Sequence, residues 1–304
     1  MYWPNPWRTH FCVQRTHSCV RDMFHCFLER FPLQIRETPK TVHHPRPIRR
    51  ATPCGIRYNR LEYMDQQTAF PLEVLPVQTQ PFDFISKEGF LRSDVFQELQ
   101  RTFPVCPPST GPTGFSFYWG DAEYEELIAS NWAWKLFFQT AHSQLFVNYC
   151  IAQFARAYRE HGCVIDLSKA VYVPYLESRQ GKEKRFLNEP YQPHELFVRL
   201  DIHQGHVGYS RKVHVDHRRR VATILVYFSD SDESGRDGGD LVLHAQKLRV
   251  LYPEGARVRP RRNLMAGFAC SGVSFHSVPR IESHASPRNF VQIQLSSTVD
   301  AWKR

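Results

Sequence analysis

Three potential metal ligands lie close together in one short stretch of the chain. His214, Asp216 and His217 belong to the segment VHVDH, which is followed by a basic run and then by an apolar run. If VHVD is a β-strand, the alternation of side chains places His214 and Asp216 on one face and His217 on the other. His214 and Asp216 then form an imidazole and carboxylate pair that could hold a divalent metal, and His217 is not its partner.

A metal site built on this pair needs a third ligand from a later strand. Three downstream histidines compete for that place, namely His244, His276 and His284. His284 lies in the turn-like segment RIESHASPR, and His276 lies in the short apolar segment GVSFHSVP. His244 ends the segment GGDLVLH and is less easily excluded. Arg288, twelve residues after His276, favours His276, because an arginine beside the site could bind a carboxylate through two hydrogen bonds.

Two strands are expected to bring polar side chains to the same cavity. In RNFVQIQLSS an apolar face alternates with a face that carries Arg288, Phe290 and Gln292. In FVRLDIH the residues opposite the apolar face are Arg199, Asp201 and His203. These last three are candidate contacts for a substrate or co-substrate, and a structural polar pairing remains the alternative. The basic run Arg218 to Arg220 either forms a solvated turn or attracts an anionic substrate.

The elements that must carry these residues change in character along the chain. From Asp121 to Gly162 apolar residues recur at three- and four-residue steps, which predicts two or three helices with a broad buried face. From residue 171 onward the period is two, in the short segments AVYVPYL, ELFVRLDIH, VATILVYF, DLVLH, GVSFHSV and FVQIQLS. The pattern predicts an α+β, mainly β fold, a double-sheet barrel or jelly roll with helices packed on the outside.

The charge of the chain is concentrated at its beginning. The net charge is +9 over 304 residues, but residues 1–63 hold 11 Lys/Arg against 4 Asp/Glu, which leaves 28 basic and 26 acidic residues elsewhere. Residues 1–63 show no sustained hydrophobic period, and we expect a basic, disordered extension there. A helical part over 64–170 and a catalytic core over 171–304 are expected to follow. The nearly neutral remainder argues against nucleic acid as its partner, so nucleic-acid binding would fall to residues 1–63.

Membrane and secretion signals are missing from the sequence pattern. No run of 18 or more apolar residues occurs, and the first residues contain no apolar signal-peptide segment. Four of the eight cysteines lie within residues 1–63, and the other four, Cys106, Cys150, Cys163 and Cys270, are widely scattered, as expected of reduced thiols. These features predict a cytoplasmic protein without a membrane partner, and they leave its oligomeric state open.

The stretch from Glu195 to Ser297 resembles the iron(II)- and 2-oxoglutarate-dependent dioxygenase superfamily, in particular its prolyl-4-hydroxylase-like branch. The elements that carry the resemblance are H-x-D at VHVD, the strand TILVYF, the turn and strand GGDLVLH, NLMAGF, FHSV and the arginine of PRNF. The resemblance implies a double-stranded β-helix with His214, Asp216 and His276 as the ligands of Fe(2+). It also implies 2-oxoglutarate as co-substrate, held at its distal carboxylate by Arg288. Tyr227 stands where relatives place a hydroxyl for that carboxylate, and a core tyrosine is the alternative.

The activity that the resemblance implies is hydroxylation of an unactivated C–H bond with O2, with release of succinate and CO2. The substrate could be a peptidyl residue, an amino acid or a small metabolite, and ascorbate is a further candidate cofactor. Two other functions stay open. Zinc would accept the same three ligands and would make a hydrolase, although the H-E-x-x-H pattern of many zinc hydrolases does not occur. A non-catalytic jelly-roll binding protein is the second alternative.

Overall fold

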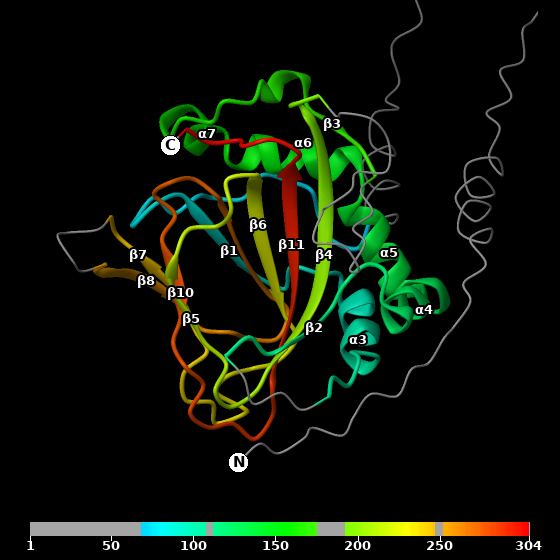
Figure 1. Cartoon of the computed structure of the whole chain (residues 1–304). Coiled ribbons are helices and arrows are strands. Elements are labelled where there is room, and N and C mark those ends of the chain that lie inside the picture. Colours follow the sequence, from blue (N-terminus) through cyan, green and yellow to red (C-terminus); the bar gives the residue numbers. More distant parts are fainter. Residues whose placement is uncertain (1–67, 108–111, 175–191, 247–251, 304) are drawn as a thin grey trace, which may run out of the picture. The chain divides into compact units, whose positions relative to one another are not determined.

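The computed structural model describes residues 68–107, 112–174, 192–246 and 252–303. The basic extension predicted over residues 1–63 lies outside the described residues and stays a prediction. Within the described residues two mainly antiparallel β-sheets face each other, and helices cover the outer side of the larger one (Figure 1). The predicted fold class, a mainly β jelly roll with helices on the outside, is confirmed.

The larger sheet contains seven strands, in the order β1-β9-β6-β11-β4-β2, with β3 pairing in parallel with β4. The strands are β1 (Phe84–Glu88), β2 (Phe115–Phe117), β3 (Val171–Tyr172), β4 (Glu195–Gly205), β6 (Arg220–Tyr227), β9 (Leu264–Ala269) and β11 (Arg288–Ser297). The smaller sheet has the order β5-β10-β7-β8, with β5 (Arg211–His214), β7 (Leu241–His244), β8 (Glu254–Val258) and β10 (His276–Val278). The chain thus enters the smaller sheet at the strand that carries His214.

Side-chain alternation in the larger sheet builds a separate apolar core on each of its faces. One core fills the space between the sheet and the helices and includes Val291, Ile293 and Leu295 of β11. The other lies between the two sheets and includes Tyr227 and Phe290 together with apolar residues of β7, β8 and β10. Since the period of a strand is two, the residues between Val291, Ile293 and Leu295 face the space between the sheets, as the sequence predicts.

The helical region is more broken than its sequence period indicates. Over Asp121 to Gly162, where two or three helices are predicted, four short ones form: α4 (Ala122–Ser130), α5 (Trp132–Ala141), α6 (Gln144–Gln153) and α7 (Ala155–Glu160). Side-chain caps set two of the breaks, because Asn131 accepts hydrogen bonds from two amides of α5 and Ser143 accepts one from α6. An earlier helix, α3 (Ser93–Arg101), and a short 3₁₀ turn, η1 (Leu167–Lys169), complete the helices of the described chain.

Two strands of the larger sheet come from the part of the chain for which helices are expected. β1 and β2 form the two edges of that sheet, and both precede the helices α4 to α7. β1 exposes its last three residues and β2 is only three residues long, so neither shows a full period of two. Among the residues that the structure describes, no helix is both long and apolar enough to cross a membrane.

Candidate metal centre

The pairing of β5 with β10 brings two histidines face to face. His214, the last residue of β5, is the register partner of His276, the first residue of β10, and their ring centroids lie 4.3 Å apart. Asp216 follows β5 in the turn that leads to β6. One ligand atom from each of His214, Asp216 and His276 lies within 4.8 Å of the other two. The three residues expected from the sequence therefore converge on one point.

Backbone carbonyl groups orient both imidazole rings. Nδ1 of His214 lies 2.7 Å from the carbonyl oxygen of Lys212, and Nδ1 of His276 lies 3.0 Å from that of Ser274. A carbonyl only accepts, so each Nδ1 carries a hydrogen, and in the neutral ring Nε2 is the nitrogen with the free lone pair. Burial lowers the pKa of His276, which keeps this ring neutral. In its neutral form each ring thus offers Nε2 to a metal ion.

The other histidines near the site do not join it. His244 uses both ring nitrogens, Nδ1 at 3.0 Å from the Tyr252 carbonyl and Nε2 at 2.7 Å from the Ser277 hydroxyl. His217 is exposed and accepts a hydrogen bond from the Arg219 amide, while His284 packs beside His206 with ring centroids 5.6 Å apart. His276 is therefore the histidine that completes the set.

Asp216 is held by three donors that the sequence did not reveal. Arg220 forms an ion pair with Oδ1, and Oδ2 accepts a hydrogen bond from the Thr223 hydroxyl at 2.7 Å and a contact from the Cys270 thiol at 3.4 Å. Burial by itself would raise the pKa of Asp216, but Arg220, His276 and Thr223 together hold that pKa below its ordinary value. The carboxylate is therefore ionised in the metal-free protein and ready to bind a cation.

A second feature of the candidate site lies between the sheets, around the buried side chain of Arg288. The side chain of Arg288 is 1% exposed, and its Nε donates to the Gly239 carbonyl at 2.7 Å. Nη2 lies 3.3 Å from the Tyr227 hydroxyl, and the guanidinium carbon lies 4.2 Å from the ring centroid of Phe290. Within the described residues Nη1 is buried without a hydrogen-bond partner. A buried guanidinium with an open donor is suited to receive an anionic group.

Asp216 and Arg288 lie at two levels along the same face of the larger sheet. Thr223, which holds Asp216, and Tyr227, which contacts Arg288, both lie on β6 and are four residues apart. Four residues of a strand span about 13 Å, and an even separation keeps both side chains on the same face. The Asp216 carboxylate and the Arg288 guanidinium therefore face the same space from opposite ends.

The neighbouring strand β4 adds a polar row to this face, as the alternation in its sequence predicts. His203, Asp201 and Arg199 oppose Phe290, Gln292 and Gln294 of β11 in register. Asp201 forms a buried ion pair with Arg199 at 3.1 Å, so a structural pairing accounts for these two. His203 stacks on Phe290 with ring centroids 4.8 Å apart, and in the described part of the chain its Nε2 is buried without a partner. Burial lowers the pKa of His203 to about 3, so this ring is neutral.

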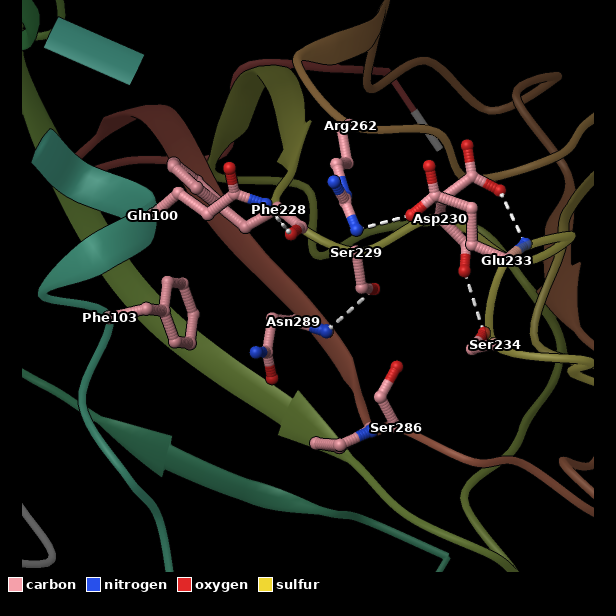
Figure 2. Close-up of a pocket in the computed structure, with 11 residues that line it drawn as sticks. Gln100, Phe103, Phe228, Ser229, Asp230, Glu233, Ser234, Arg262, Ser286 and Asn289 are labelled. Carbon is pink, nitrogen blue, oxygen red and sulfur yellow. Dashed lines mark hydrogen bonds and ion pairs between the residues drawn. The ribbon is translucent and has the colours of Figure 1, made fainter. Parts of the chain in front are cut away.

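A cavity of about 310 Å³ lies next to this region but does not include it. Figure 2 shows its lining, which comes from α3, from the turn after β6 and from the start of β11. Ser286, Pro287 and Asn289 line the cavity, while Arg288 between them belongs to the space between the sheets. None of the metal-ligand candidates contributes to this lining, so the cavity is a separate feature of the surface.

The part of the chain that carries the candidate metal ligands matches a known family. Residues 199–293 match the sequence profile described as the 2OG-Fe(II) oxygenase superfamily. This stretch contains His214, Asp216, His276 and Arg288. No curated protein matches the chain.

Solved structures of prolyl hydroxylases are among the structural neighbours. A prolyl 4-hydroxylase from Phytophthora capsici is 15% identical with a TM-score of 0.42, and the alignment covers 72% of this chain and 60% of that one. A Pseudomonas putida prolyl-4-hydroxylase is 14% identical with a TM-score of 0.41 and covers 71% and 93%. A Trichoplax adhaerens prolyl hydroxylase, solved with a hypoxia inducible factor peptide fragment, is 15% identical with a TM-score of 0.39 and covers 70% and 83%.

The chain thus spans less than two thirds of the first of these neighbours. The structural scores are low, so the family identity rests on the profile match and on the converging residues. The segment 199–293 belongs to the 2OG-Fe(II) oxygenase superfamily.

Proposed function

We propose that this protein is an iron(II)- and 2-oxoglutarate-dependent oxygenase. It would hydroxylate an unactivated C–H bond of a peptidyl residue, an amino acid or a small metabolite, with O2 as oxidant and succinate and CO2 as further products. The observation that carries the proposal is the convergence of His214, Asp216 and His276, with the open guanidinium of Arg288 on the same side of the larger sheet.

The donor set fits ferrous iron. Two neutral imidazoles and one carboxylate on one side of a metal leave coordination positions open for other ligands, as non-haem iron oxygenases require. The Nε2 atoms of His214 and His276 and one oxygen of Asp216 would hold the ion. Bound Fe(2+) would supply the redox chemistry that activates O2, while the protein supplies the ligands and their orientation.

The guanidinium fits the distal carboxylate of 2-oxoglutarate. Nη1 of Arg288 has no partner among the described residues, and Nη2 makes only the long contact with the Tyr227 hydroxyl. A carboxylate placed there would accept hydrogen bonds from Arg288, and Tyr227 would donate a further one. Burial keeps the Tyr227 hydroxyl protonated, because it raises the pKa of this residue. Arg288 and Tyr227 would thus fix the end of the co-substrate that does not react.

The apolar core between the sheets would keep bulk water from the bound groups. Tyr209, Tyr227 and Phe290 surround the Arg288 guanidinium, with ring centroids within 5.7 Å of its carbon, which strengthens an ion pair formed there.

The four cysteines that the structure describes are free thiols, which agrees with a cytoplasmic location.

A zinc hydrolase is the second candidate function, because zinc accepts the same ligand set. Its supporting observation is the donor set alone. A hydrolase has no need for the buried guanidinium of Arg288, so this residue favours the oxygenase.

Succinate formation tests the proposal. Protein purified without oxygen and loaded with Fe(2+) should convert 2-oxoglutarate to succinate when O2 is admitted, and ascorbate should sustain the rate if it is a cofactor. His276→Ala should abolish the conversion and Arg288→Gln should weaken it. Turnover of a hydrolysable substrate by the zinc-loaded protein, without any 2-oxoglutarate requirement, would support the hydrolase instead.

A further inference from the structure

The carboxylate of Asp216 has one free acceptor position left among its contacts in the described residues. A carboxylate offers about four lone-pair positions, two on each oxygen. The Thr223 hydroxyl and the Cys270 thiol occupy both positions of Oδ2, at 2.7 Å and 3.4 Å. Arg220 occupies one position of Oδ1. A metal ion at this site must therefore bind Oδ1, the atom that Arg220 already holds.

Arg220 and a metal ion would thus share one oxygen, each at its own lone-pair position. Both are cations, and Asp216 is buried with a side-chain exposure of 3%, so solvent screens their mutual repulsion only weakly. Arg220 itself is 27% exposed, which gives its guanidinium a route to water when a metal ion arrives. The residue has no second ion pair in the described part of the chain that would hold it against the carboxylate.

We infer that Arg220 lowers the affinity of the site for its metal by holding a positive charge at Oδ1 of Asp216, so that the protein holds Fe(2+) less tightly than its three ligands would allow. This inference rests on the proposed function, since it concerns the metal that the oxygenase needs. Arg220 is a positioning residue here, because it acts on the metal through Asp216. It also stabilises the metal-free protein, where it keeps a buried carboxylate paired.

Metal affinity measured without any turnover tests this inference. Mn(2+) binding under exclusion of oxygen would be measured by calorimetry for the wild type, Arg220→Gln, Arg220→Lys and Arg219→Gln. Arg219→Gln is the matched control, because the substitution removes the same charge. Arg219 is exposed and makes no side-chain contact with Asp216 among the described residues. Arg220→Gln should bind Mn(2+) tighter by on the order of ten-fold, because a like charge on the same carboxylate oxygen is removed.

The two other variants separate the effect of a charge at Asp216 from the effect of the net charge of the protein. Arg219→Gln should bind as the wild type does, and Arg220→Lys, which keeps the cation, should stay close to the wild type. Thermal unfolding supplies an independent readout. Metal-free Arg220→Gln should melt at a lower temperature than the wild type, and saturating Mn(2+) should raise its Tm more, because metal binding adds to stability.

Weaker or unchanged Mn(2+) binding by Arg220→Gln would overturn the inference, as would a gain of equal size in Arg219→Gln. Equal gains in Arg220→Gln and Arg220→Lys would also overturn it, since charge would then not be the cause. Loss of Mn(2+) binding in His276→Ala supports the metal site independently of Arg220. If neither the wild type nor Arg220→Gln bound Mn(2+), the metal site and the inference would both fall, whereas binding by Arg220→Gln alone would support the inference.

Discussion

His214 and His276 are register partners at the ends of two neighbouring strands, with ring centroids 4.3 Å apart. Their meeting depends on the pairing of β5 with β10, which lie more than sixty residues apart in the chain. A carbonyl two residues before each ring uses its Nδ1, which leaves Nε2 of both rings as the nitrogen for a metal ion. The proposed metal site is therefore a product of strand register rather than of a local motif.

The first prediction concerns the choice of the third ligand. His276→Ala should abolish the binding of divalent metal, because the two remaining ligands, His214 and Asp216, hold a metal poorly. His244→Gln is the control, since His244 also lies in the smaller sheet but uses both nitrogens elsewhere. Metal content after dialysis measures both variants. Retention of metal by His276→Ala together with loss in His244→Gln would place the third ligand at His244.

A second prediction concerns Arg288. Arg288→Gln should weaken 2-oxoglutarate binding by about 10- to 100-fold, the size of a lost charged hydrogen bond pair. Metal affinity should not change, since Arg288 lies at the other end of the site. Tyr227→Phe should show a smaller effect of the same kind. Titration of the metal-loaded protein with 2-oxoglutarate measures all three, and an unchanged affinity in Arg288→Gln would remove this residue from the co-substrate site.

The turn that supports Arg288 gives a third prediction. Gly238 has φ +82°, and a Cβ there would lie 1.8 Å from the Arg280 carbonyl oxygen. Gly238→Ala should cost about 3 kcal/mol or more of unfolding free energy, from backbone strain and overlap together. It should also weaken 2-oxoglutarate binding, because the next residue, Gly239, accepts the hydrogen bond from Arg288 Nε.

Gly235 supplies the matched control for this substitution. Its φ is also positive, at +53°, but a Cβ there would meet nothing within 4 Å. Gly235→Ala should therefore cost only about 1 to 2 kcal/mol and leave 2-oxoglutarate binding intact. Equal costs in urea unfolding for the two variants would show that the contact with Arg280 does not matter.

The buried histidines predict how stability depends on pH. Burial lowers the pKa of His203 to about 3 and that of His142 to about 4, from an ordinary value of 6.5. The folded protein keeps both rings neutral while the unfolded chain takes up protons, so stability is full above pH 6.5 and falls as the pH decreases toward 4. Each histidine contributes a slope of up to about 1.4 kcal/mol per pH unit.

Non-titrating replacements would separate the two contributions. His203→Asn should remove the contribution of His203 to the pH dependence of the unfolding free energy, and His142→Gln should remove that of His142. The two residues lie on opposite sides of the larger sheet, so their effects should add. Urea unfolding at several pH values between 7 and 5 measures the slopes. A slope that neither replacement changes would mean that other groups cause the acid sensitivity.

Residue patterns in the chain were sufficient to predict much of this arrangement, and the reason is periodicity. The alternation in β4 and β11 correctly placed Arg288, Phe290 and His203 on the face between the sheets. The edge strands β1 and β2 escaped detection because their exposed or very short patterns resemble those of loops. The expected boundaries at residues 63 and 170 stay predictions, and a chain shortened to start at Met64 that still folds would support the first.

What the sequence could not supply was the environment of Asp216. Thr223 and Cys270 approach it from β6 and from the end of β9, and only the folded sheet brings them together. The basic run Arg218 to Arg220 was read as a solvated turn or as an attraction for an anionic substrate. Arg220 instead pairs with the carboxylate of the metal site. A run of three arginines gives no sign of which one turns inward.

Binding of 2-oxoglutarate to the anaerobic, iron(II)-loaded protein tests the central claim most directly, because it does not depend on knowing the substrate. Fe(2+) and 2-oxoglutarate together should produce a charge-transfer absorption that neither gives alone. The absorption should be absent in His276→Ala, and in Arg288→Gln it should require a higher 2-oxoglutarate concentration. A protein that binds iron through His214, Asp216 and His276 but shows neither this absorption nor any affinity for 2-oxoglutarate would contradict the account.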